Sequence, residues 1–230
     1  MAASVNSFRR LKYNLSRLSV NVPGWRTDRK IVVIESDDWG SIRMPNIKTR
    51  DEFEKKGYKL SGNPYCRFDT LANSEDLNKL FNTLLKFKDG KGNHPIITAN
   101  TVVANPDFET IKNSNYLNYN FKSFTNTLEE YYPNEDIFKI WEQGLASRIF
   151  IPQYHGREHV NVLVWLKELQ LMNEVFVEAF KYGFWGVPRE LYNKRIPNIQ
   201  AAYNSNKADD IVFFKKSITN GLQLFEDIFK

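Results

Sequence analysis

The chain has 230 residues and a mass of 27.0 kDa, enough for one large domain or two small ones. Hydrophobic residues make up 42% and aromatic residues 14%, a composition typical of a soluble globular protein with a sizeable core. The net charge of +5 includes no long basic block, so nucleic acid is not indicated as a partner. A single cysteine, Cys66, excludes an internal disulfide and a thiolate metal cluster.

No apolar run reaches the length of a membrane span, and the N-terminus lacks the apolar core of a signal peptide. We therefore expect a cytoplasmic protein. Residues 1–28 are expected to form a basic helical extension of a main domain over residues 29–230. The helix would pack on that domain rather than lie on a membrane surface, because its apolar face is modest. This face consists of residues at helical spacing: Phe8, Leu11, Leu15 and Leu18.

The apolar, β-branched run over residues 30–35 predicts a first strand that is buried on both faces. It leads into Ser36–Gly40, where Asp37 and Asp38 are adjacent. Two carboxylates at the end of a buried strand are costly unless a positive charge compensates them, which a metal ion would do. The alternative interpretation is a polar loop that caps the next helix.

Further along the chain, a helix from residue 73 or 74 to 88 and a strand over 94–103 complete a strand–helix–strand unit, which indicates a parallel sheet. His94 opens that second strand, so we expect it at the opposite end from Asp37, in a structural role. Residues 50–72 and 111–123 are expected to be irregular. Residues 190–202 are weakly helical, and clear helices are predicted over 123–131, 134–146, 160–182 and 208–229.

A third strand is predicted from Ile149 to Gln153, followed by His155 and His159. Imidazoles four residues apart share one face of a helix and can bind one divalent metal ion. The alternative is two surface histidines. Three buried strands, each followed by helix, make the first part of a β/α barrel, but a barrel needs about eight strands. The fold is therefore either a small open α/β layer or a barrel whose C-terminal strands are missing.

Two motifs, Ser36–Gly40 after the first strand and His155–His159 after a later one, resemble the polysaccharide deacetylase family (carbohydrate esterase family 4, the NodB-homology fold). The longer strings Asp37–Arg43, Ala104–Phe108 and Pro152–His159 resemble a bacterial polysaccharide deacetylase-like subgroup. The resemblance runs from about residue 29 onward. It implies a distorted β/α barrel and one divalent metal ion, usually zinc, bound by one Asp and two His.

Position by position, the resemblance implies that Asp37 is the general base and that Asp38, His155 and His159 bind the metal. Metal-activated water would remove acetyl groups from an acetylated poly- or oligosaccharide. Tyr154, Arg157 and Glu158 either orient the imidazoles or form a surface ion pair. We expect the residues beside the ligands or the substrate to be Trp39, Asn105, Tyr154, Arg157 and Glu158.

The family also uses a late histidine as general acid on the leaving group, and His159 is the last histidine of this chain. We therefore expect a C-terminally truncated form that keeps the metal site, with an exposed edge strand that favours self-association. Two further functions are open. One is a non-catalytic domain that binds metal or carbohydrate. The other is a His-x-x-Glu-His zinc protease with Glu158 as base, which requires a helix where Gly156 favours a turn.

Overall fold

The computed structural model describes residues 2–60, 62–205 and 207–230, in two compact units, Met1–Val33 and Ile34–Lys230. The first unit contains the expected N-terminal helix, α1 (Ala2–Asn21). Its apolar side chains Leu11, Leu15 and Leu18 are exposed. The division falls after residue 33, five residues later than the expected boundary at residue 28.

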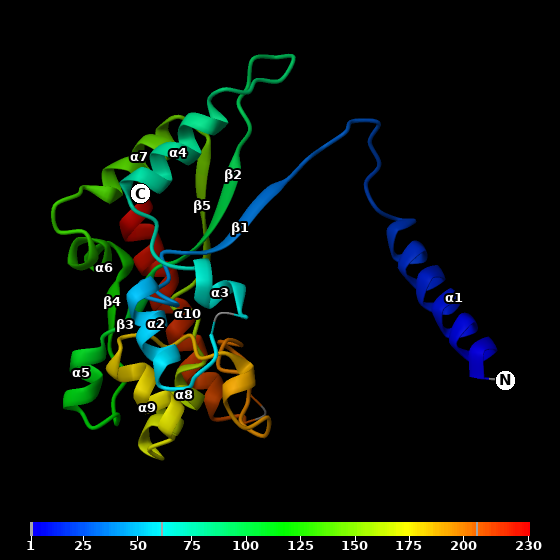
Figure 1. Cartoon of the computed structure of the whole chain (residues 1–230). Coiled ribbons are helices and arrows are strands. Elements are labelled where there is room, and N and C mark those ends of the chain that lie inside the picture. The colour runs from blue at the N-terminus through cyan, green and yellow to red at the C-terminus, as the bar shows by residue number, and fades with distance from the viewer. Residues whose placement is uncertain (1, 61, 206) are drawn as a thin grey trace. The chain divides into compact units, whose positions relative to one another are not determined.

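The second unit is built on a parallel sheet of three strands, β1 (Ile34–Trp39), β2 (Ile97–Val102) and β5 (Phe150–Gly156), with β2 in the middle (Figure 1). The strand–helix–strand spacing therefore predicted the parallel pairing correctly. Over the described residues the sheet does not close into a barrel. The mixed α/β architecture is the small open layer, and the predicted barrel is not confirmed.

The prediction of a first strand over residues 30–35, buried on both faces, is wrong in both place and burial. The strand begins at Ile34, which pairs with Ile97, and its first two residues, Ile34 and Glu35, are exposed. The physical reason is that, in the part of the chain that the structure describes, β1 has a neighbouring strand on one side and none on the other, so its start is not enclosed. In consequence Asp37 and Asp38 belong to the strand itself and not to a loop after it.

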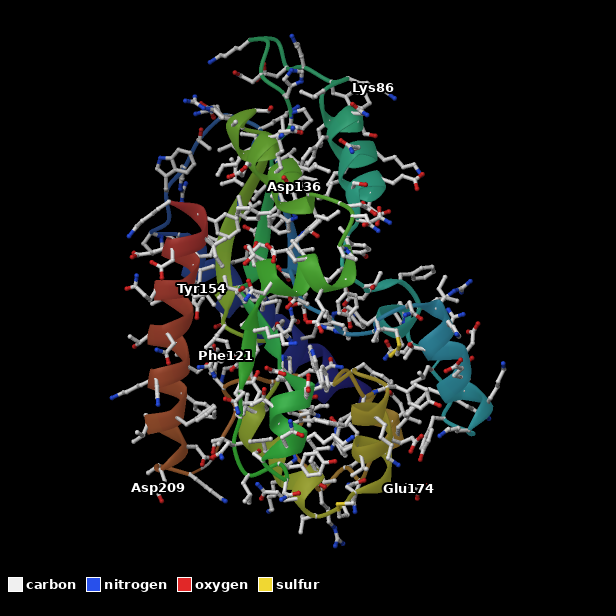
Figure 2. The ribbon with its side chains drawn as sticks, turned by 90° about the vertical axis from the view of Figure 1, so that its left-hand side faces the viewer. Lys86, Phe121, Asp136, Tyr154, Glu174 and Asp209 are labelled. Carbon is white, nitrogen blue, oxygen red and sulfur yellow. The ribbon has the colours of Figure 1, made fainter. Side chains whose placement is uncertain are left out.

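Helices cover one face of the sheet: α4 (Ser74–Leu84), α7 (Ile137–Ala146) and α10 (Asp210–Phe229) (Figures 1 and 2). Gly144 of α7 permits close approach, since a Cβ there would lie 3.0 Å from the Cβ of Phe150. Phe229 of α10 joins the same aromatic cluster, with its ring 6.0 Å from Trp141. On the other face, Asn100 is half-buried and Gln153 is exposed.

A second core lies around the large buried side chains Trp165, Phe176 and Trp185. Residues 50–72 and 111–123 contain more regular structure than expected, while 190–202 contain less. The remaining elements are α2 (Ile47–Lys55), α3 (Pro64–Phe68), β3 (Ala104–Pro106), which pairs antiparallel with β4 (Phe121–Ser123), α5 (Phe108–Asn113), α6 (Phe124–Tyr131), α8 (Val162–Gln170), α9 (Glu174–Lys181) and a 3-10 turn at Arg189–Leu191. Within the described ranges, none of the helices is both long and apolar enough to cross a bilayer.

Candidate metal centre

Asp38 lies at a β-bulge near the end of β1. Ser36 pairs with Ala99 and Trp39 with Thr101, so β1 has one residue more than β2 over this step. Asp38 has φ = 65°, a left-handed conformation that costs a non-glycine residue about 1–3 kcal/mol. Bulges redirect side chains and are frequent beside active sites. The bulge therefore sets the direction of the Asp38 side chain.

The same bulge separates the two adjacent carboxylates. Asp37 remains on the exposed part of the strand, where its Oδ1 accepts a hydrogen bond of 2.6 Å from Asn100 Nδ2. Asp38 is only 14% exposed and lies beside the two histidines. Neighbours in sequence therefore occupy two different environments.

His155 lies at a second bulge, on β5. Thr101 pairs with Tyr154 and Val102 with Gly156, so His155 is the additional residue. The following Gly156 has φ = 148°, a backbone conformation in which a residue with a side chain would be strained. No helix forms until Val162, the first residue of α8. The helical spacing of the two histidines is therefore not what brings them together; the bulge and the turn do.

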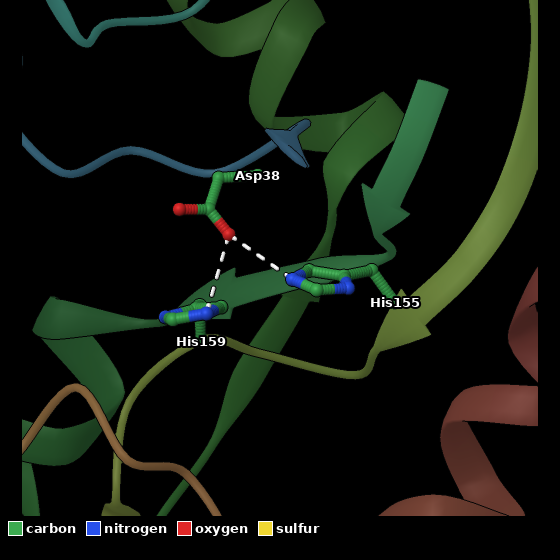
Figure 3. A group of neighbouring side chains, drawn as sticks. All are labelled: Asp38, His155 and His159. Atoms are coloured by element: carbon green, nitrogen blue, oxygen red, sulfur yellow. Dashed lines mark ion pairs between the residues drawn. The ribbon is translucent and has the colours of Figure 1, made fainter. Parts of the chain in front are cut away.

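The three predicted ligands converge, as Figure 3 shows. Asp38 Oδ1 lies 3.4 Å from His155 Nε2 and 3.3 Å from His159 Nε2. One ligand atom from each residue lies within 4.8 Å of the others. The imidazoles are 30% and 24% exposed, so the group is partly shielded but accessible.

The geometry of these atoms fits a tetrahedral divalent ion. Ligand bonds of about 2.0–2.1 Å at tetrahedral angles place ligand atoms about 3.3–3.4 Å apart, the separation of Asp38 Oδ1 from both imidazoles. Asp38 Oδ1 is buried and has no hydrogen-bond partner among the described residues; the two imidazoles at ion-pair distance carry charge only when protonated. Because a buried carboxylate oxygen beside neutral imidazoles is costly, a cation at this point would satisfy it.

The protonation of His159 is also suited to a ligand. Burial lowers its pKa; Arg43 and His155 act in the same direction, and Asp38 opposes them. The neutral imidazole is the form that binds metal. Its Nδ1 is buried without a hydrogen-bond partner, and the ring stacks on Trp185 at 6.3 Å. Stacking, rather than a hydrogen bond to Nδ1, holds this ring.

Arg43 is a site residue that sequence reasoning missed. It is 2% exposed, and its Nη2 donates a hydrogen bond of 2.6 Å to Asp38 Oδ2. Its Nε forms an ion pair with Asp69 Oδ2 at 3.3 Å. Burial raises the pKa of Asp69 to about 6; Arg43 opposes this shift and Asp38 adds to it. The only sequence signal was the position of Arg43 at the end of the string Asp37–Arg43.

A cavity of about 310 Å³ lies on the Asp38 side of the cluster, and among the described residues its lining includes Asp38 but neither histidine. Asp37, Asp38 and Asp69 contribute carboxylates to its wall, and Trp39 and the 72%-exposed Phe68 contribute rings. Trp39 follows Asp38 in the chain and lines the cavity, and its ring also packs into the aromatic cluster of the helix-covered face; its predicted role beside ligand or substrate stays a prediction. The cavity offers hydrogen-bond acceptors and an aromatic surface next to the candidate metal position.

Asn105 was expected beside ligands or substrate, and this is wrong. Its side chain is buried; Nδ2 donates to Gly40 O and Oδ1 accepts from Ile42 N, both at 2.8 Å. This side chain fixes the turn between Asp38 and Arg43. The physical reason for the error is that a buried amide is satisfied by backbone groups, which a sequence motif does not reveal.

Tyr154, Arg157 and Glu158 do not orient the imidazoles through any hydrogen bond of the described residues, nor is the ion pair at the surface. Arg157 Nε donates to Glu158 Oε2 at 2.5 Å, and both residues are only 4% exposed. Ser217 of α10 donates to Glu158 Oε1 at 3.1 Å. Tyr154 lies against the same helix, with Oη 3.4 Å from Ile218 O. These residues attach α10 to the sheet.

His94 precedes β2, at the end of that strand remote from Val102, and its Nδ1 lies 2.8 Å from Phe87 O. Its expected separation from the site and its structural role agree with this position.

Comparisons of the chain with protein-family models, with curated proteins and with solved structures found no match. The function of the site is therefore inferred from its own geometry.

Proposed function

We propose that the chain is a metal-dependent hydrolase that removes acetyl groups from a carbohydrate, with one zinc-class ion held by Asp38, His155 and His159. The observation that carries the proposal is the buried Oδ1 of Asp38, which has no hydrogen-bond partner among the described residues and lies at tetrahedral ligand separations from two imidazoles. Two neutral imidazoles and one carboxylate leave a coordination position for water and substrate. When bound, the ion acidifies that water and polarises the acetyl carbonyl.

The residues of the chain have separate roles in this proposal. Asp37 takes the proton of the attacking water; its carboxylate lines the same cavity as Asp38 and is exposed enough to reach solvent. Asn100 donates to Asp37 Oδ1 and so leaves Oδ2 as the proton acceptor. As the acetyl C–O or C–N bond breaks, Asp37 returns this proton to the leaving oxygen or nitrogen of the sugar. The carboxylates of the cavity accept hydrogen bonds from sugar hydroxyls, and the exposed ring of Phe68 gives the sugar a flat apolar surface.

The zinc-protease alternative is not favoured by the position of Glu158. That pattern needs two histidines and a glutamate on one helix. Here the segment before Val162 is not helical, and the Glu158 carboxylate is buried in its ion pair with Arg157. A base in that pattern must reach the metal-bound water, which this carboxylate does not face.

Metal analysis of the purified protein is the first test. We expect about one zinc-class ion per chain, with its loss in the His155→Ala variant. His94→Ala removes the third histidine, remote from the site, and should keep the ion. A metal-free wild type, after dialysis against zinc, would overturn the proposal.

Acetate release from acetylated chitooligosaccharides or acetylated xylan is the second test. Asp37→Asn should abolish the release while the metal content stays at one ion. Asp209→Asn, which changes an exposed aspartate with no side-chain capping bond, is the matched control and should be fully active. Metal binding without acetate release from either substrate would instead support the non-catalytic binding domain.

A further inference from the structure

The two oxygens of the Asp38 carboxylate have different neighbours: one faces Arg43 and the other faces the candidate metal position. Oδ2 accepts the 2.6 Å hydrogen bond from Arg43 Nη2. Oδ1 accepts none and lies 3.3–3.4 Å from the two imidazoles. A carboxylate with both oxygens free can bind a cation through one or both of them. The occupied Oδ2 leaves a single oxygen for the ion.

The guanidinium of Arg43 is held rigidly enough for this task. The residue is 2% exposed, and its Nε faces Asp69 at 3.3 Å. Its guanidinium lies over the ring of Tyr65 at 4.5 Å and of Trp185 at 5.8 Å. At Gly186 a Cβ would collide with Arg43 Cγ and lie 2.8 Å from Arg43 O, so the Gly186 backbone packs against the stem of this side chain. A side chain locked by packing and a charge partner can fix the orientation of the group that it contacts.

We propose that Arg43 is a positioning residue that makes Asp38 a one-oxygen ligand and keeps the coordination position for water open. The proposal rests on the metal site proposed above. A second oxygen of Asp38 on the ion would fill the position that the attacking water needs. Arg43 itself touches neither the ion nor the substrate and acts only through Asp38.

Charge alone would give the opposite expectation. A guanidinium close to a bound cation repels it, so its removal would by itself tighten metal binding. Orientation, in contrast, is lost when Arg43 is removed, and partners of this kind contribute about 10- to 100-fold to metal affinity. Affinity and coordination number, measured together, therefore separate the two effects.

The test uses the full chain loaded with Co²⁺, whose visible absorption is strong in four-coordinate sites and weaker at higher coordination. We expect Arg43→Gln to lower the Co²⁺ absorption toward the higher-coordinate intensity and to weaken Zn²⁺ binding by about 10-fold or more. Arg43→Lys should recover most of the wild-type spectrum, because an ammonium can still donate to Oδ2. Asp69→Asn should give an intermediate spectrum. X-ray absorption on the zinc forms gives the coordination number independently.

Arg50→Gln is the matched control, because it removes an arginine that pairs with Asp51 on α2, and it should leave spectrum and affinity unchanged. An Arg43→Gln protein with the wild-type spectrum, whether its affinity is unchanged or tighter, would overturn the proposal. If Arg43→Gln does not fold, the spectrum of the Asp69→Asn variant decides, and a wild-type spectrum of that variant would refute the proposal. If the wild-type protein binds no metal, the proposed function fails too. If it binds metal and the Arg43→Gln spectrum is unchanged, only the proposed role of Arg43 fails.

Discussion

The segment from the end of β5 to the loop before α8 carries two pairs of polar side chains that lie in different environments. His155 and His159 turn to Asp38 and stay partly exposed, around an oxygen without a hydrogen-bond partner. Arg157 and Glu158, which lie between them in sequence, are buried and bonded to each other. Two of these four residues thus contribute to the candidate site. The other two form the ion pair that contacts α10, here called the structural joint.

The difference shows what distinguishes a ligand site from a structural ion pair. Both clusters contain charged groups in restricted solvent, so neither charge nor burial separates them. In the joint, the carboxylate of Glu158 has partners on both oxygens, from Arg157 and Ser217. In the candidate site, Asp38 Oδ1 has none and remains within reach of a ligand. Between these two carboxylates, the oxygen without a hydrogen-bond partner, and not the charge, marks the one that can take a ligand.

The largest expected effect comes from the structural joint. Glu158→Ala should lower the free energy of unfolding by about 3–5 kcal/mol, because the Arg157 guanidinium would stay buried without its partner. Urea denaturation measures this. Glu226→Gln, which breaks an exposed pair with Lys230, is the control and should have little effect. A Glu158→Ala protein as stable as that control would show that the two clusters are not energetically different.

The second prediction concerns the metal side of the same loop. His159→Ala should weaken Zn²⁺ binding by more than the roughly 10- to 100-fold expected for a residue outside the ligand set, because a ligand is lost. The metal-free stability should change far less than in Glu158→Ala, since His159 Nδ1 makes no hydrogen bond. Competition with a fluorescent chelator gives the affinity. Equal metal affinities in His159→Ala and wild type would show that His159 is not a metal ligand, contrary to the difference drawn between the two clusters.

Asp69 provides a pH-dependent version of the comparison. Its pKa is raised to about 6 in the folded chain from an ordinary 3.8, so the folded state holds the proton more tightly than the unfolded state. The resulting stabilisation is complete below about pH 4 and is lost as pH rises through 6. The free energy of unfolding of metal-free Asp69→Asn, relative to that of wild type, should therefore rise by about 2 kcal/mol between pH 4 and 7. Denaturant titrations at several pH values check this; parallel profiles would contradict it.

The smallest effect is expected where α10 meets the loop. In Gly221→Ala the new Cβ would lie 2.8 Å from Arg157 Cβ and would also collide with Tyr154 Oη. Overpacking costs about 1–3 kcal/mol, while the better helix propensity of alanine returns about 1 kcal/mol. We expect the free energy of unfolding to fall by about 1 kcal/mol, which thermal unfolding measures. Tyr154→Phe in the same chain should recover part of it; no recovery would place the strain at Arg157 alone.

The clustering of the three candidate ligands and the parallel sheet could be predicted from the sequence. Asp38, His155 and His159 have the residue types of a zinc-class site and follow predicted strands, and the geometry brings all three together. The strand–helix–strand spacing gave the pairing of the sheet. These features depend on local pattern and on chain order, which a single sequence contains.

The directions of the side chains could not be predicted. One additional residue in β1 and one in β5 decide where Asp38 and His155 point, and register depends on packing across the whole sheet. The contact of Arg43 with Asp69 joins two irregular segments through tertiary structure alone. The burial of Arg157 likewise depends on α10, which follows much later in the chain.

The close approach of Gly186 to Arg43 has a consequence for biosynthesis. Gly186, whose backbone packs against the stem of Arg43, is made roughly 150 residues after Asp38, which takes about 7–30 s at ribosomal rates of 5–20 residues per second. Arg43 and Asn100, which bond to the two carboxylates, are made soon after the first strand, whereas His155, His159 and Gly186 follow much later. The full set of contacts around Asp38 can therefore form only late in translation.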